Sequence, residues 1–434
     1  MKFHTNNKFK RHDMFNGTLW LAGWIDEPLK KLNHSFADHI IPKVKGQFAL
    51  VWHGKDGWWL AMCDHLCTYP LWYSEDGEHV FSLWEQARTH DTLSDEVFYA
   101  MRDLLYGQMT IGTRTGRQNI KRLQPDHCLD RGTQQRYRNS INCISDGPPM
   151  SEWGDILETS VKVCCGDGDA LLLSGGRDST TIANIAHHLG IDLDYIHVTR
   201  GKPNPDTDAV KEFSNNLGIK INYMDPWKEN IEWNEWDYWH DSSYGPKRKC
   251  LQMLNLTSGV SGELGASESG SKKINTILQM PDITIEQLTN IWITTLEARN
   301  ESCASPLIHD DYTERHPENR FWKQAYREII EFFEQRYKEL KNTTDDNHQL
   351  LKAAIMLHQQ DHEAYRLHNY SQDMTITWNH PFTHPDWFNI IMNAPLELKQ
   401  LHYHNREVYR IAARRWQWFD ETAWNYGGPR GLTQ

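Results

Sequence analysis

Long apolar runs are absent from the sequence. No stretch of about 18 consecutive apolar residues, the length that a membrane-spanning helix needs, occurs in the chain of 434 residues. The segment Met1-Lys2-Phe3-His4-Thr5-Asn6-Asn7 also contains no apolar core of the kind found in secretory signal peptides. We therefore expect an intracellular, cytoplasmic protein with no membrane partner.

An excess of basic residues is also absent. The chain has 46 Lys and Arg residues against 58 Asp and Glu residues, so its formal net charge at pH 7 is −12. Proteins that bind nucleic acids or anionic membranes need a cationic face. The charge therefore argues against nucleic acid as a partner. The oligomeric state stays open, with a homodimer as one option.

Cysteine is sparse. Eight cysteines are too few for a disulfide scaffold, and no pair of CxxC motifs and no HExxH motif indicates a zinc site. Cys63 and Cys67 flank His65, which weakly resembles a metal site, but the segment has the pattern of a strand and a turn with buried thiols. We expect these cysteines to be core residues.

Aromatic residues, by contrast, are plentiful: they make up 12% of the chain and include 19 Trp, which is typical of a folded protein. At roughly 150 residues per domain, the length predicts two or three domains. Apolar runs separated by turns indicate strands in the first 140 residues, and the turn-rich segment 145–150 indicates a domain boundary. The predicted strands are residues 18–24, 47–52, 58–63 and 70–73, with a helix around 95–105.

The pattern after this boundary is an alternation of helices and strands. A predicted helix from Ser151 to Val163 is followed by strands and helices in turn, which is typical of a parallel sheet with helices on its faces. The predicted strands are 169–173, 194–198 and 219–224, and the predicted helices are 178–189 and 207–217. From about residue 284 the spacing of apolar residues indicates further helices, including 321–341 and 347–367.

The most informative motif lies where strand 169–173 meets helix 178–189. It reads Ser174-Gly175-Gly176-Arg177-Asp178-Ser179-Thr180. Two glycines let the backbone curl so that successive N–H groups face one point, and the helix N-terminus adds partial positive charge; together they favour an anion. An aspartate at such a site is explained if a cation, most simply Mg²⁺, bridges it to a phosphate. The alternative is a glycine-rich turn capped by Ser and Asp.

This motif resembles the PP-loop of ATP pyrophosphatases, and its surroundings are similar to those of the asparagine synthetase and β-lactam synthetase family. An acidic segment at residues 204–210 matches the family, and a third family segment corresponds to the stretch that begins with Ser258 and Gly259. Glu263 then occupies the position of the second metal-binding acid. Val260 departs from the acidic or Tyr residue that the family has near the acceptor.

Weaker similarities extend over most of the chain. Segments that look like the family's glutaminase domain are 46–52, 64–65, 69–73 and 119–127, and segments that look like its synthetase domain are 379–382 and 394–399. The resemblance implies α+β and α/β parts: an Ntn-hydrolase-like α+β sandwich over 1–140, and a PP-loop parallel α/β synthetase domain with a helical C-terminal part over 150–434. The family's glutaminase needs a cysteine directly after the initiator Met, and this chain has Lys2. A degenerate, inactive class II amidotransferase-like domain is therefore expected.

The resemblance implies an ATP- and Mg²⁺-dependent ligase that forms AMP and pyrophosphate. A small carboxylate would be adenylated and then attacked by an amine that does not come from glutamine. Asp178 and Glu263 are the implied metal ligands and catalytic residues, and Arg430 is the implied cationic clamp on the phosphates, with Arg177 as its rival. The residues expected to bind the nucleotide are Leu173, Ser174, Gly175, Gly176, Arg177, Asp178, Ser179, Val198, Ser258 and Gly259.

Three alternatives stay open at this point. They are an ammonia-dependent asparagine synthetase, a PP-loop enzyme that modifies a nucleobase, and a nucleotide-binding homologue without activity. The second usually carries a catalytic cysteine pair or a basic face, neither of which is evident here. The missing nucleophile and Val260 favour the third. The sequence does not identify the carboxylate or the amine.

Overall fold

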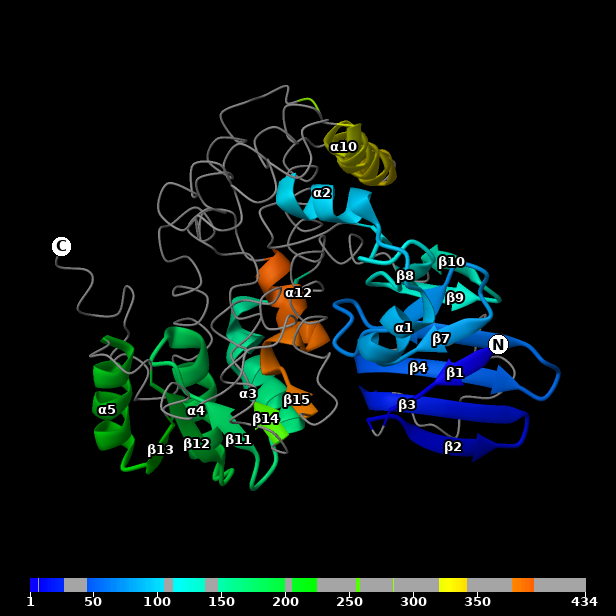
Figure 1. Ribbon diagram of the computed structural model, residues 1–434. Helices are drawn as coiled ribbons and strands as arrows, with labels where there is room; N and C mark the ends of the chain where they lie inside the picture. The colour runs from blue at the N-terminus through cyan, green and yellow to red at the C-terminus, as the bar shows by residue number, and fades with distance from the viewer. Residues whose placement is uncertain are drawn as a thin grey trace. The chain divides into compact units, whose positions relative to one another are not determined.

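The computed structural model (Figure 1) divides the chain into two compact units. The first comprises Met1–Ser145 and Ser267–His368, and the second comprises Asp146–Ala266 and Asn369–Gln434. The residues that the structure describes are 1–6, 8–26, 45–104, 112–136, 147–199, 205–224, 255–257, 284, 320–341 and 377–393. Within these residues, no helix has both the length and the apolar character needed to cross a membrane.

The first unit contains a six-stranded sheet in which every neighbouring pair is antiparallel. Its order is β10 (Thr133–Arg136), β9 (His127–Asp130), β5 (Trp59–Cys63), β4 (Gly46–Gly54), β3 (Gly17–Ile25) and β2 (Lys10–Met14). The predicted strands 18–24, 47–52 and 58–63 correspond to β3, β4 and β5, which are confirmed to within a few residues.

A second sheet of the first unit has four strands. Its order is β1 (Lys2–His4), β7 (His79–Phe81), β6 (Trp72–Ser74) and β8 (Ile120–Arg122). The pair β1 and β7 is parallel, and the other two pairs are antiparallel. The predicted strand 70–73 thus begins two residues later, at Trp72. Pro70 has no N–H to donate, which suits a position before the strand.

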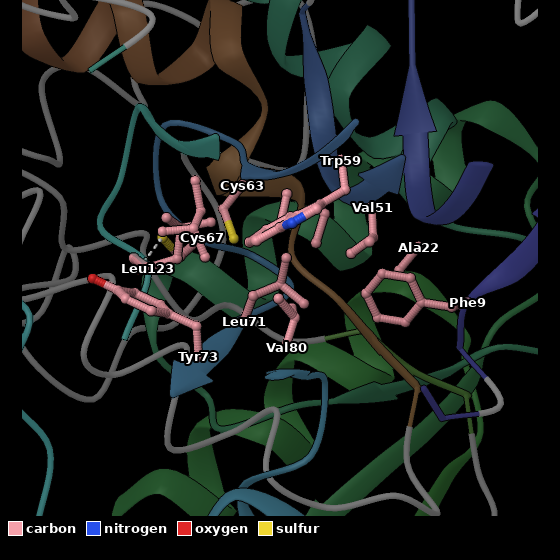
Figure 2. Close-up of a cluster of buried hydrophobic side chains, with 13 residues drawn as sticks. Phe9, Ala22, Val51, Trp59, Cys63, Cys67, Leu71, Tyr73, Val80 and Leu123 are labelled. Carbon is pink, nitrogen blue, oxygen red and sulfur yellow. Dashed lines mark hydrogen bonds between the residues drawn. The ribbon is translucent and has the colours of Figure 1, made fainter. Parts of the chain in front are cut away.

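Side chains of the two sheets meet in one buried cluster (Figure 2). Alternate residues of a strand point to opposite faces, so Val51 of β4 and Cys63 of β5 join Tyr73 and Val80 of the smaller sheet in this cluster. The intervening residues of β3, β4 and β5 form a second buried cluster, with members including Leu19, Leu50, Trp52, Leu60 and Met62. Burial on both faces explains why these strands read as continuous apolar runs.

Three helices belong to the described part of the first unit: α1 (Trp84–His90), α2 (Glu96–Leu104) and α10 (Arg320–Lys341). The predicted helices around 95–105 and over 321–341 correspond to α2 and α10. Helix α10 packs against α2, although more than 200 residues separate them in the chain. The domain ranges 1–140 and 150–434 stay predictions.

The second unit is built on a five-stranded parallel sheet. Its order is β13 (Ile221–Met224), β12 (Asp194–Val198), β11 (Ala170–Leu172), β14 (Asn255–Thr257) and β15 (Thr377–Asn379). The described helices are α3 (Trp153–Cys164), α4 (Arg177–Leu189), α5 (Pro205–Leu217) and α12 (Pro385–Asn393). The predicted alternation of strands and helices up to residue 224 is confirmed, so the chain combines α/β and α+β character with parallel and antiparallel sheets.

Candidate functional site

The segment Ser174–Thr180, which we call the SGG loop, follows β11 at a topological switch point of the parallel sheet. Within the sheet, the next strands along the chain, β12 and then β13, lie on one side of β11, whereas β14 and β15 lie on the other side of β11 (Figure 1). In open α/β sheets of this kind, ligands bind outside the carboxyl ends of the strands at the point where the order reverses. The SGG loop therefore occupies the place where the architecture favours a ligand.

Gly175 turns the chain out of the sheet. Its φ of +75° lies in the left-handed region that side chains other than glycine's rarely adopt. A Cβ atom on Gly175 would also lie 2.7 Å from the carbonyl oxygen of Asp206 and 3.1 Å from the Cβ of Ala209. Both contacts belong to α5, so the missing side chain lets the loop lie directly against the first turns of that helix.

Hydroxyl groups fix the shape of the loop from within. The Ser174 N–H donates to Ser179 Oγ at 3.1 Å, and the two serine hydroxyls lie 3.1 Å apart. Thr180 Oγ1 donates to the carbonyl oxygen of Gly176 at 2.8 Å. Because Ser174 and Ser179 are five residues apart, their contacts close the loop into a compact turn.

Helix α4 begins at Arg177, within the SGG loop. Gly176 is the N-cap and makes no side-chain capping bond, and Asp178 stands in the first turn. The first N–H groups of a helix have no acceptor within the helix and carry partial positive charge. These donors and the half-buried Asp178 carboxylate are the groups with which the loop can hold a phosphate and a hydrated cation.

A buried histidine on the neighbouring strand contacts the residue that directly precedes the SGG loop. His197 on β12 places Nδ1 at 2.7 Å from the carbonyl oxygen of Leu173 and Nε2 at 2.9 Å from Thr207 Oγ1. His197 is not among the site residues predicted from the sequence. The available signal was a polar residue inside the otherwise apolar run Tyr195-Ile196-His197-Val198, which indicates a buried polar group with specific partners.

The structure brings together the predicted residues at positions 173–179, although the side chain of Arg177 lies outside the described residues. Val198 ends the adjacent strand β12. Ser258, Gly259, Glu263 and Arg430 lie outside the described residues, as do Val260 and the segment 394–399. Within the described ranges, no group of three or more potential ligands marks a metal site, and Cys63 and Cys67 are core residues as expected.

The first unit contains a fully buried carboxylate at Asp64. It accepts hydrogen bonds from the backbone N–H groups of Phe48 at 2.7 Å and Leu66 at 2.8 Å, and from the N–H of Thr68. Burial raises the pKa of Asp64 to about 6, against the opposing effect of these hydrogen bonds. The carboxylate thus connects the segment after β5 to β4. Because the donors named here are backbone N–H groups of these segments, Asp64 stabilises the local fold.

A comparison with known protein families finds no family that matches this chain, and a search of curated proteins finds no match. The resemblance to asparagine and β-lactam synthetases therefore stays a prediction from the residues of the chain.

Proposed function

We propose that the protein is an ATP-dependent ligase that forms AMP and pyrophosphate, activates a small carboxylate by adenylation and joins it to an amine. The observation that carries the proposal is the SGG loop. It stands at the switch point of a parallel sheet and contains the N-terminus of α4, whose N-cap Gly176 makes no side-chain capping bond, with Asp178 in the first turn. Nucleotide phosphates are commonly bound at such loops.

In this proposal the residues of the loop bind the pyrophosphate part of ATP. The N–H groups at the start of α4 would donate to phosphate oxygens, as would the one hydroxyl proton that the contact between Ser174 and Ser179 does not use, which would stabilise charge that gathers on the leaving group. Asp178 would hold Mg²⁺, with Glu263 as the second ligand implied by the resemblance. When bound, Mg²⁺ neutralises phosphate charge and orients the leaving group.

The adenine would lie beside the carboxyl ends of β11 and β12. Leu173 and Val198 end or directly follow these neighbouring strands, which pair in parallel. Ser258 and Gly259, which follow β14 directly in the sequence, are assigned to the same site by the resemblance. Arg430, or Arg177 in the loop, would supply the cationic side chain on the phosphates.

We further propose that the first unit is an Ntn-hydrolase-like sandwich without glutaminase activity. Two sheets that share one buried cluster are consistent with a sandwich. Cys63 and Cys67 lie inside that cluster, and burial raises the pKa of the Cys67 thiol well above its usual value. A thiol held neutral in the core is a poor nucleophile, so the amine would come from a separate small molecule in the cytoplasm.

The test is to incubate the protein with MgATP and a panel of small carboxylic acids, with and without amines. We expect AMP and pyrophosphate in amounts that depend on the carboxylate, and an amide product detectable by mass. Formation of ADP and phosphate would contradict the proposal, as would the absence of nucleotide turnover across the panel.

A further inference from the structure

His197 links three parts of the second unit through one buried ring. The residue is 2% exposed and lies on β12. Its Nδ1 contacts the carbonyl oxygen of Leu173, the residue just before the SGG loop, at 2.7 Å. Its Nε2 contacts the hydroxyl of Thr207, in the first turn of α5, at 2.9 Å. The ring therefore connects the residue before the loop to the helix against which the loop packs.

The two contacts fix the proton positions of the neutral ring. A carbonyl oxygen can only accept, so Nδ1 must carry a proton and donate to Leu173. Nε2 of the neutral ring is then an acceptor, and the Thr207 hydroxyl donates to it. Tyr223 on the neighbouring strand β13 packs edge-on against the ring, with centroids 5.7 Å apart. The orientation of the imidazole is thus set from three sides.

The same contacts hold the loop where it leaves the sheet. The Leu173 N–H donates to the Ile196 carbonyl oxygen at 2.8 Å, so both backbone polar groups of Leu173 are bound to β12. Two residues later, Gly175 lies against the carbonyl oxygen of Asp206, the neighbour of Thr207. Without the ring, the Leu173 carbonyl would lose its side-chain donor, and the link from β12 to α5 would be lost.

We infer that His197 is a positioning residue for the phosphate-binding loop, acting through Leu173 and Thr207 and not by contact with the nucleotide. The inference rests on the proposed function. Displacements of about 1 Å in groups that position a reacting phosphate can lower rates by about a hundredfold. A ring that fixes both the loop and the adjacent helix therefore governs how well the loop's donors converge on pyrophosphate.

Three substitutions separate the two contacts of the ring. In His197→Asn the amide nitrogen can occupy the place of Nδ1 and still donate to Leu173. His197→Gln places its amide near Nε2, toward Thr207, and leaves the Leu173 carbonyl without that donor. His197→Leu removes both contacts. The control is Ser160→Ala in α3, which loses a buried hydrogen bond to the Pro381 carbonyl in the same unit and should lower stability without touching the loop.

The experiment measures the affinity of each full-length variant for inorganic pyrophosphate and for MgATP by calorimetry, together with its thermal unfolding. We expect His197→Gln and His197→Leu to weaken binding by about tenfold or more, which corresponds to roughly 1.4 kcal/mol. We expect His197→Asn to bind within about threefold of the wild type, and Ser160→Ala to bind normally although it is less stable.

Equal affinity in all three His197 variants and the wild type would overturn the inference while leaving the proposed function intact. The inference would also be overturned if affinity fell in proportion to stability in Ser160→Ala as well as in His197→Leu. His197 would then have a purely structural role. A wild-type protein that binds neither probe would overturn the proposed function, and the inference with it.

Discussion

Arg114 and Glu328, which are 214 residues apart in the chain, form a two-point ion pair in the first unit: Nε lies 2.6 Å from Oε2 and Nη2 lies 2.7 Å from Oε1. Arg114 also donates through Nη1 to Asp95 at 2.7 Å. Glu328 belongs to α10, and Asp95 directly precedes α2. The guanidinium therefore connects the two helices that pack together, and the flanking carboxylates raise the pKa of Arg114 further above its usual value.

We expect this pair to contribute measurably to stability. Both side chains are about a quarter exposed, and paired geometry of this kind is stronger than an ordinary surface contact. A double-mutant cycle with Arg114→Met and Glu328→Gln, followed by urea unfolding, should give a coupling energy of about 1–3 kcal/mol. The single contact between Lys211 and Asp208 in α5, whose side chains are 58% and 77% exposed, is the control and should couple by less than about 0.5 kcal/mol. Equal coupling in both pairs would contradict the prediction.

The same pair has a predictable pH dependence. Burial opposes ionisation of Glu328, but hydrogen bonds from Arg114 and Gln324 hold its pKa below the usual 4.5. A carboxyl group with a lowered pKa stabilises the folded state above its unfolded pKa, and this contribution is lost as the pH falls through the folded value. The coupling energy should therefore be constant from pH 6 to 8, where the pH is at least about 1.5 units above the unfolded pKa, and should decline below about pH 4.

Gly175, before the N-cap of α4, provides a test of the loop geometry, and Gly190, the C-cap of the same helix, is the matched control. Gly175 and Gly190 have nearly the same φ, +75° and +71°, but an added Cβ meets Asp206 at the first and nothing within 4 Å at the second. Gly190→Ala should cost about 1–2 kcal/mol from backbone strain alone. Gly175→Ala should cost a further 1–3 kcal/mol, roughly, from overpacking. Chemical unfolding measures both, and equal losses would contradict the close approach of loop and α5.

Asp64 should make stability depend on pH in the direction opposite to that of Glu328. Its pKa of about 6 lies above the usual 3.8, so the folded state binds the proton more tightly than the unfolded chain does. Its contribution is therefore complete below about pH 3.8 and is lost as the pH rises through about 6. Over that interval the wild type should lose about 3 kcal/mol relative to Asp64→Asn.

Asp64→Asn supplies the reference because an amide does not titrate. At pH 7 it should still be less stable than the wild type by about 1–3 kcal/mol, since its NH₂ group would face a backbone N–H that now donates to the carboxylate. The measurement is urea unfolding of both proteins between pH 4 and 7. A stability difference independent of pH would show that Asp64 titrates below this range.

Local sequence patterns predict the buried strands and the SGG loop because burial selects apolar residues, and tight turns select glycine, at adjacent positions in the chain. The apolar runs of β3 to β5 and the two glycines before α4 are examples of these patterns. Strand β2, with the sequence Lys10-Arg11-His12-Asp13-Met14, has no such apolar pattern because it is a largely exposed edge strand that buries no face. No local pattern could pair Arg114 with Glu328, or His197 with Leu173, because those partners are chosen by the tertiary fold.

The remaining prediction concerns Asp178, which stands in the first turn of α4 as Asp155 stands in the first turn of α3. Each carboxylate belongs to the first turn, near the positive end of its helix, so neutralising either to Asn should cost a similar 0.3–1 kcal/mol, roughly, in stability. Asp178 alone lies in the proposed phosphate site, and asparagine there removes a ligand suited to Mg²⁺.

Asp178→Asn should therefore lose at least about a hundredfold in AMP formation, whereas Asp155→Asn should retain wild-type turnover at nearly the same unfolding midpoint. The two variants are compared in one assay that follows pyrophosphate release at several Mg²⁺ concentrations. Partial recovery of Asp178→Asn at high Mg²⁺ would support a role in holding the cation, because a weakened site is refilled by mass action. Full activity of Asp178→Asn at low Mg²⁺ would show that the carboxylate does not serve the reaction, and the loop would then need another explanation for an acidic residue at its anion-binding end.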